Sequence, residues 1–118
     1  MKPTTILTLD TTNASMLSVS LHIQGTEYTK HEDTGLRKSV RLLPLCTEIL
    51  YEHHLSWADL TDIRVVNKEG SITGLRVGFT VANALGFLLG ISVNGMPAMK
   101  NIHPQYGTLT YLDKPLKE

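Results

Sequence analysis

The chain has 118 residues, of which 42% are hydrophobic, which suits one domain with a packed core and excludes an intrinsically disordered chain. Its 11 basic and 11 acidic side chains give a formal net charge of zero, so no overall field favours nucleic acid, a membrane surface or an acidic substrate. The single cysteine, Cys46, excludes an internal disulfide and fits a reducing compartment, so we expect a cytoplasmic protein. Asp10 interrupts the first apolar stretch, and no secretory signal peptide is therefore expected.

The first third of the chain predicts an antiparallel meander of three strands. Residues 5–9 form a short apolar run that ends in a cluster of turn-forming residues beginning at Asp10. Apolar and polar residues alternate over residues 17–23, which is the period of a half-buried strand. Residues 24–25 then supply a tight turn, and residues 26–31 continue as the third strand.

A helix is expected over residues 36–54, with Asp33 or Thr34 as its N-terminal cap. A helix that lies on a sheet needs an apolar band of roughly 100°, and this segment has about twice that width. The surplus indicates a second contact surface. Pro44 lies inside the pattern, removes one backbone hydrogen bond and is expected to kink the helix.

The second half predicts two further strands and one further helix. Ser56 and Asp59 have the spacing of a capping box around a short helical turn, with Trp57 as an apolar anchor. Strands are expected over residues 62–67 and 91–94, on either side of a long apolar helix. The fold class is therefore α/β, with a mixed five-stranded sheet in the element order βββαβαβ. We expect one domain over residues 1–96 and a C-terminal extension or tail over residues 97–118.

The long apolar helix ends at Gly90 and begins after the turn at Gly70, with a serine or threonine cap. No charged residue lies between Arg76 and Lys100, so the helix has only a narrow polar strip. A helix of this kind must be covered on more than one side, by its own sheet and by a partner. About 20 apolar residues can also span a bilayer, but Asn83 and the β-rich segment that follows argue against a membrane role.

The chain resembles the TsaB family, also called YeaZ, over about residues 4–95. The resemblance rests on short runs, of which the last is the most specific: Leu9-Asp10-Thr11-Thr12, Arg41-Leu42-Leu43-Pro44, Leu55-Ser56 with Asp59-Leu60, and Gly70-Ser71-Ile72-Thr73-Gly74-Leu75-Arg76-Val77-Gly78. TsaB is the noncatalytic partner of TsaD in bacterial synthesis of tRNA N6-threonylcarbamoyladenosine (t6A).

The resemblance implies a single actin-like ATPase domain, with the strand order of ribonuclease H, and no enzymatic activity of its own. In that family the two helices of this domain pack against the equivalent helices of TsaD as a four-helix bundle. A TsaD-like subunit is thus the expected partner and would hold the ATP and the metal, while this chain needs no cofactor. A TsaE-like ATPase is a further expected partner, tRNA is contacted only indirectly, and the chain pairs with itself when TsaD is missing.

The chain also departs from the family pattern. The family's second actin-like domain has no counterpart in these residues, Lys68-Glu69 replaces a Gly-Pro pair, and Lys38 replaces a histidine before Ser39. These differences suggest a minimal or divergent member. They leave open whether it still supports the reaction.

Three groups of residues are candidate sites. The predicted partner interface combines surplus apolar positions of the two helices: Leu42, Leu45, Cys46, Ile49, Arg76, Thr80, Asn83, Ala84 and Phe87. A candidate vestigial nucleotide loop comprises Asp10, Thr11 and Thr12, for which a loop-structuring role is favoured. A structural turn comprises Gly70, Ser71, Thr73 and Gly74; it starts a helix and is therefore able to hold an anion, but it lacks the lysine of a P-loop.

No catalytic residues and no metal site are assigned. Cys46 lies on an apolar helical stripe and is interpreted as a buried hydrophobic residue instead of a nucleophile. Two alternatives stay open beside the scaffold hypothesis. One is a nucleotide-binding half-enzyme completed by homodimerisation, and the other is a homodimeric interaction module unrelated to tRNA.

Overall fold

The structure is a computed structural model that describes residues 3–97. Its elements follow the predicted order: β1 (Thr5–Asp10), β2 (Met16–Ile23), β3 (Thr26–Asp33), α1 (Lys38–Glu52), a 3-10 turn (Trp57–Asp59), β4 (Asp62–Val65), α2 (Ile72–Leu89) and β5 (Ser92–Val93). Apart from Pro97, the extension expected over residues 97–118 lies outside the described residues, so the domain boundary at residue 96 stays a prediction.

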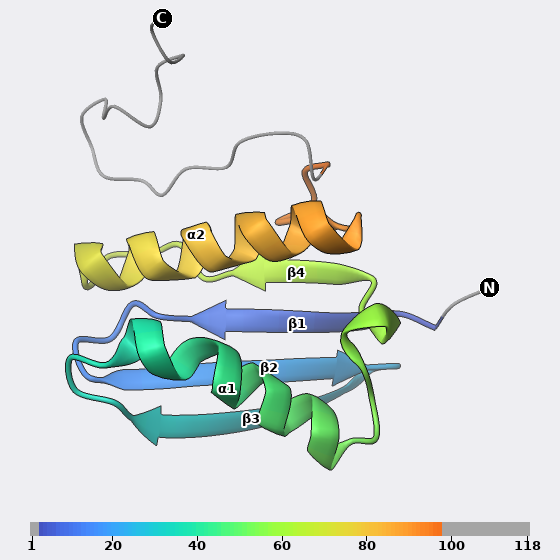
Figure 1. Cartoon of the computed structure of the whole chain (residues 1–118), viewed down its shortest axis with the longest axis horizontal. Helices are drawn as coiled ribbons and strands as arrows, with labels where there is room; N and C mark the ends of the chain where they lie inside the picture. Colours follow the sequence, from blue (N-terminus) through green and yellow to red (C-terminus); the bar gives the residue numbers. More distant parts are fainter. Residues whose placement is uncertain (1–2, 98–118) are drawn as a thin grey trace, which may run out of the picture.

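The five strands form one mixed sheet in the order β3-β2-β1-β4-β5 (Figure 1). β1, β2 and β3 are antiparallel neighbours, whereas β4 and β5 run parallel to β1. Gln24 and Gly25 have φ angles of 48° and 89° and make the tight turn between β2 and β3. The predicted α/β fold with a mixed five-stranded sheet is therefore confirmed.

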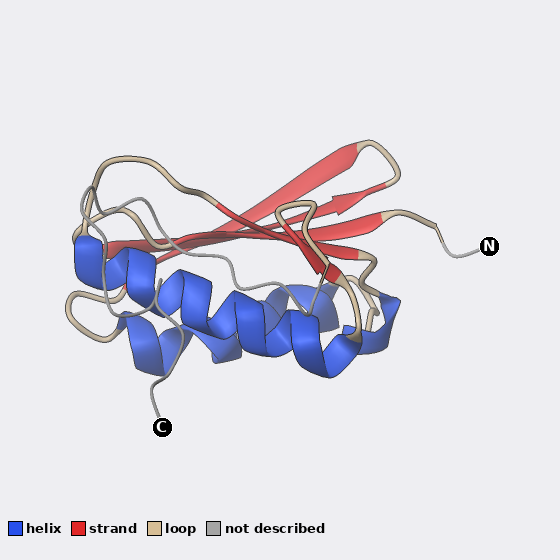
Figure 2. Cartoon of the chain, turned by 90° about the horizontal axis from the view of Figure 1, so that it is seen from above, coloured by secondary structure: helices blue, strands red, loops and turns tan. Residues whose placement is uncertain are grey.

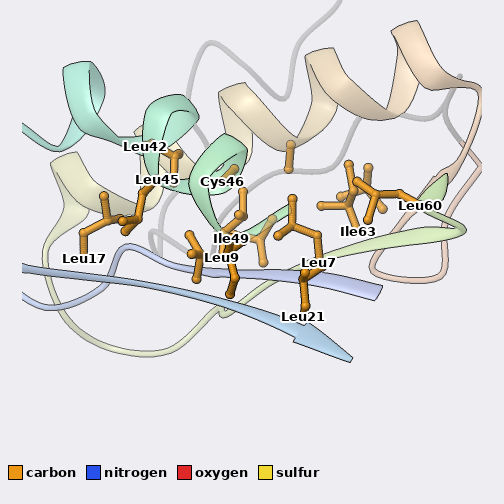
Figure 3. Packing of buried hydrophobic residues seen from close by; sticks show 14 of the residues in the cluster. Leu7, Leu9, Leu17, Leu21, Leu42, Leu45, Cys46, Ile49, Leu60 and Ile63 are labelled. Atoms are coloured by element: carbon orange, nitrogen blue, oxygen red, sulfur yellow. The ribbon is translucent and has the colours of Figure 1, made fainter. Parts of the chain in front are cut away.

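Both helices lie on the same face of the sheet, and the other face is uncovered (Figure 2). The core fills the space between the sheet and the helices, as Figure 3 shows. Alternate residues of the strands point into it, among them Leu7, Leu9, Leu17 and Leu21. The opposite face carries polar side chains, such as the hydrogen-bonded pair of Ser20 and Thr29 at 2.9 Å. A sheet that is packed on one face and solvated on the other explains the period-two pattern of the first strands.

The inner stripe of α1 differs from the prediction. Leu42, Leu45, Cys46 and Ile49 were predicted to face a partner, but all four have at most 1% of their surface exposed and pack against the sheet. This part of the interface prediction is therefore wrong. The sheet needs an apolar cover over β1 and β2, and this stripe supplies it.

The surplus apolar surface of α1 lies on the neighbouring stripe. Val40 and Leu43 are 61% and 44% exposed, and Leu36, just before the helix, is fully exposed. The charged flank of the helix faces β3: Arg41 donates two hydrogen bonds to Glu32, of 2.6 and 2.9 Å. With the inner stripe on the sheet and this flank toward β3, the stripe of Val40 and Leu43 faces outward.

The start of α1 also differs from the prediction. The helix begins at Lys38, its N-cap position is Arg37, and no side chain caps it. Asp33 accepts a hydrogen bond from the Gly35 N–H at 3.2 Å, and the Thr34 hydroxyl donates to the Ser15 carbonyl at 3.1 Å. Both side chains thus shape the turn before the helix. By contrast, the predicted capping box of Ser56 and Asp59 is present.

α2 packs against β4 and β5. Ser71 caps its start, accepting a hydrogen bond from the Gly74 N–H at 3.0 Å, and Gly90 ends it with a left-handed φ of 68°. The helix is long and apolar enough to cross a membrane by length and composition, and 33% of it is buried. Here it lies along the sheet and returns the chain into β5. Its outer side is left uncovered.

A charge at Ile49 tests this orientation of α1. We expect Ile49→Asp to abolish the cooperative thermal transition, because a buried, unpaired carboxylate costs several kcal/mol, close to the roughly 5–15 kcal/mol that stabilise a small domain. Leu43→Asp places the same charge on the exposed stripe and should melt within a few degrees of the wild type. Circular dichroism during heating measures both. A folded Ile49→Asp variant would show that this stripe faces solvent.

Candidate functional site

The loop after β1 is held by its own side chains. The Asp10 carboxylate accepts hydrogen bonds from the Thr12 N–H at 3.1 Å and from the Thr12 hydroxyl at 2.6 Å. Its other oxygen lies 3.9 Å from Nζ of Lys68, an exposed side chain. The carboxylate therefore acts as the acceptor of a side-chain-capped turn. This geometry supports the loop-structuring interpretation of Asp10 to Thr12.

The start of α2 lies directly against this loop. The Ser71 N–H donates to the Thr12 carbonyl at 2.7 Å. A Cβ atom on Gly70 would overlap the Thr12 carbonyl oxygen, and one on Gly74 would overlap the Thr11 carbonyl oxygen. Glycine is required at both positions because the two backbones touch there. Thr73, the remaining residue of the predicted turn, is exposed.

One turn further along α2, Gly78 faces the Thr11 side chain. A Cβ on Gly78 would lie 2.5 Å from Oγ1 of Thr11. This hydroxyl is buried and has no hydrogen-bond partner within the described part of the chain. Leaving a buried hydroxyl unpaired costs roughly 1–3 kcal/mol. The close contact between α2 and the loop after β1 therefore forms even though it leaves the Thr11 hydroxyl without a hydrogen bond.

A cleft of about 730 Å³ opens beside the loop. Its lining mixes charges of both signs: Asp10, Thr12, Asn13, Ala14, Met16, Ser18, His31, Lys68, Glu69, Gly70 and Ser71. Residues 3–97 contain no group of three or more His, Cys, Asp or Glu side chains able to hold a metal ion. Hydrogen-bond donors and one lysine are nevertheless present for an anionic ligand.

Sequence reasoning missed one pair in this cleft. Oγ of Ser18 and Nδ1 of His31 lie 2.8 Å apart, on opposite positions of β2 and β3. The pairing follows from the hairpin: a two-residue turn at Gln24 and Gly25 puts Ser18 opposite His31. The signal was therefore present in the position of the turn.

Known proteins with similar sequences point to one family. The family model described as TsaD, tRNA N6-adenosine threonylcarbamoyltransferase, matches residues 32–108, which is more than half of the chain. A protein of Bacillus subtilis (strain 168), named tRNA threonylcarbamoyladenosine biosynthesis protein TsaB, is 32% identical over 100 residues. The protein of the same name from Buchnera aphidicola subsp. Baizongia pistaciae (strain Bp) is 30% identical over 98 residues.

The chain belongs to the TsaB/YeaZ family.

Solved structures agree with this assignment. YeaZ from Pseudomonas aeruginosa superposes with a TM-score of 0.71 at 29% identity, over 76% of this chain and 42% of that one. An uncharacterized protein with similarity to peptidase YEAZ from Pseudomonas aeruginosa gives a TM-score of 0.72 at the same identity. The fold is thus the actin-like, ribonuclease-H-like domain of YeaZ. The alignments span 83% of this chain but only 43% of each TsaB relative, so the chain spans about half the length of these relatives.

Cys46 of this family member lies in the core and has no exposed surface. Burial raises the pKa of its thiol from 9.0 to about 12. The folded protein therefore keeps the thiol protonated at pH values where the unfolded chain has lost the proton. A nucleophilic thiolate is not available here near neutral pH.

The Gly74 contact gives a prediction with an unusual sign. Replacing a helical glycine by alanine normally stabilises a helix by up to about 1 kcal/mol. We expect Gly74→Ala to destabilise this protein by about 1–3 kcal/mol, because the new methyl group meets the Thr11 carbonyl. Thr80→Ala, at an exposed position of the same helix, should stay within about 0.5 kcal/mol of the wild type. Urea denaturation measures the difference. A stabilised Gly74→Ala variant would contradict the close contact between Gly74 and the Thr11 carbonyl.

Cys46 makes unfolding free energy depend on pH. Between pH 9 and 12 the folded state binds a proton that the unfolded state has released, so this contribution to stability falls as the pH rises. It is complete below pH 9 and decreases above that by up to about 1.4 kcal/mol per pH unit. Urea denaturation at pH 8 and at pH 10 measures the change. Cys46→Ala is the control, and it should show a smaller loss; equal losses would mean that the thiol is accessible.

Proposed function

We propose that this chain is a noncatalytic subunit that binds a TsaD-like catalytic subunit and supports t6A modification of tRNA. The observation that carries the proposal is an apolar surface on the two helices, on the side away from the sheet, that no other part of residues 3–97 covers. We call it the outer helix surface; it comprises Leu36, Val40, Leu43, Thr80, Ala84, Phe87 and Leu88. An apolar area of several hundred Å² is unusual on a monomer and marks an interface.

The α2 residues that the sequence predicts at the interface are accessible on this surface. Arg76, Thr80, Ala84 and Phe87 are exposed, and Asn83 is half-buried. Phe87 and its neighbour Leu88 are 61% and 75% exposed, more than most large apolar side chains of a folded domain. The small side chains of Thr80 and Ala84 let another helix approach closely. On α1, the residues predicted for the interface are covered by the sheet, and we assign Val40 and Leu43 to the interface instead.

Charges are arranged to leave the apolar surface free. Lys30 pairs with Glu52 at 2.7 Å, and Arg41 pairs with Glu32 and Glu48, so the charged residues of α1 are gathered on the flank toward β3. These pairs are exposed and add little stability. Their position matters more, because burying the outer helix surface would not require ion pairs to be stripped of water.

Family membership supports the choice of a TsaD-like partner. The relatives are named as t6A biosynthesis proteins, and the matching family model is described as the threonylcarbamoyltransferase itself. Two chains that share this fold can pair through equivalent helices with a two-fold arrangement. In our proposal the TsaD-like subunit holds the ATP and the metal, a TsaE-like ATPase joins the complex, and tRNA contacts this chain only indirectly. The complex would work in the cytoplasm, and this chain would pair with itself when the partner is missing.

The cleft beside Asp10 favours a second candidate function, a nucleotide-binding half-enzyme completed by homodimerisation. Its volume of about 730 Å³ is large enough for a nucleotide. Against it, one Asp10 oxygen already accepts two hydrogen bonds from Thr12. Isothermal titration with ATP distinguishes the two functions: saturable binding to the isolated chain, lost in Asp10→Ala, would favour the half-enzyme.

Co-expression with the TsaD homologue of the same cell tests the scaffold. The wild-type chain should co-purify with it, and Val40→Glu and Phe87→Glu should each reduce recovery at least tenfold, because a charge in a dry apolar interface is left unpaired. Thr29→Glu is the matched control, since it places the same charge on the opposite face of the sheet. All three variants should keep the wild-type melting transition.

Loss of function in the cell completes this test. Depleting the chain should lower the t6A content of tRNA, measured by mass spectrometry of digested tRNA, and only the wild type and Thr29→Glu should restore it. No co-purification together with unchanged t6A would overturn the scaffold proposal. A homodimer without any effect on t6A would instead support an interaction module unrelated to tRNA.

A further inference from the structure

The first turns of the two helices enclose a second cavity, of about 330 Å³. Figure 1 shows that α1 and α2 both begin at the same end of the sheet, where β1 and β4 point. The lining comes from both helix starts and from the loops before β2 and α1: Ala14, Gly35, Leu36, Lys38, Ser39, Ser71, Thr73, Gly74 and Val77. Two helix N-termini, each with a partial positive charge, therefore meet at one cavity.

Lys38 lies in the wall of this cavity without a partner. Only 6% of the residue is exposed, and no hydrogen bond or ion pair binds its ammonium group among the residues that the structure describes. Burial lowers the pKa of Lys38, and the charge of nearby Asp33 only partly opposes this. A cation in the first turn of a helix also opposes the helix dipole. The ammonium nitrogen keeps some contact with solvent, and no carboxylate within residues 3–97 forms an ion pair with it.

Hydrogen-bond donors surround the same space. The backbone N–H groups of Ser39 and Thr73 lie in the first turns of α1 and α2, and neither has an acceptor within residues 3–97. Both residues also carry an exposed hydroxyl group on the cavity wall. The start of α2 lacks a lysine of its own in the sequence, and the fold brings Lys38 to it from α1.

We infer that this cavity binds a phosphate group, held by the Lys38 ammonium and by the N–H groups of Ser39 and Thr73. The donors belong to two separate helices, which suits the several oxygens of a phosphate better than the two oxygens of a carboxylate. A volume of about 330 Å³ leaves room for a small organic group beside the phosphate. Leu36 and Val77 offer apolar contacts for such a group. The inference does not depend on the scaffold proposal.

Titration with inorganic phosphate tests the site, followed by amide chemical shifts of the wild-type protein. We expect saturable shifts at residues 38–39 and 73–74, because these residues line the cavity. A parallel titration with glycerol 3-phosphate distinguishes the two sources of the group. Tighter binding of the ester indicates an organic phosphate as the ligand, and equal binding indicates free phosphate. Shifts that do not saturate, or that centre on residues 10–12 and Lys68, would overturn the inference.

Two lysine variants with the same change of charge sharpen the test. Lys38→Met should weaken phosphate binding at least tenfold, whereas Lys30→Met, which removes an exposed lysine on β3, should leave it within twofold. Phosphate should raise the melting temperature of the wild type and not that of Lys38→Met. Without phosphate, Lys38→Met should melt at or above the wild-type temperature, because it buries no charge. Unchanged binding in Lys38→Met would refute the role of Lys38, and the wild-type shifts decide the site even if this variant does not fold.

Discussion

The contact between the start of α2 and the loop after β1 governs much of this structure. Two glycines, Gly70 and Gly74, let the helix approach the carbonyl oxygens of Thr11 and Thr12 more closely than any side chain permits. The hydrogen bond from Ser71 to Thr12 fixes the direction of the approach. From this seat α2 runs along β4, and it returns the chain into β5 after Gly90. The short β5 is extended by Asn94, whose amide bonds both backbone groups of Val65.

The same seat determines which surfaces remain free. α2 lies over β4 and β5, and α1 lies over β2. Each helix packs one face against the sheet, and no other part of residues 3–97 covers its opposite face. For α1 the buried stripe contains Leu42, Leu45, Cys46, Ile49 and Leu50, and the hydrogen bonds from Arg41 to Glu32 join the adjacent flank to β3. The geometry shows only that these stripes are exposed. Membership of the TsaB/YeaZ family is the reason for proposing that a partner binds there. The proposed interface of helix faces would cover the part of α2 that the sheet leaves exposed.

The two helix starts create the polar chemistry of the molecule. In the loop after β1, the Asp10 carboxylate accepts two hydrogen bonds from Thr12, which hold the loop in its conformation without a ligand. By contrast, the Lys38 side chain lies beside the first N–H groups of the two helices, and within residues 3–97 its ammonium group has no anionic partner. The two charged groups therefore differ: Asp10 has hydrogen-bond partners within its own loop, and Lys38 has none within residues 3–97. A binding function is therefore better supported at the cavity of Lys38 than at the loop that family resemblance suggests.

Local patterns were sufficient for the elements of this fold. Alternation over β2, the turn at Gln24 and Gly25 and the capping box at Ser56 depend on residues close in sequence, so the sequence predicted the order of the elements. The pairing of Ser18 with His31 was missed, although it follows from the position of the turn. The outward stripe of α1 could not be predicted, because periodicity gives the width of an apolar band and not its direction. That direction depends on the sheet and on the ion pair with Glu32. Glu32 lies on β3, so the pattern of the helix itself contains no information about this contact. The meeting of Lys38 with Thr73 was equally hidden, because it arises only when two separate helices are seated at one end of the same sheet.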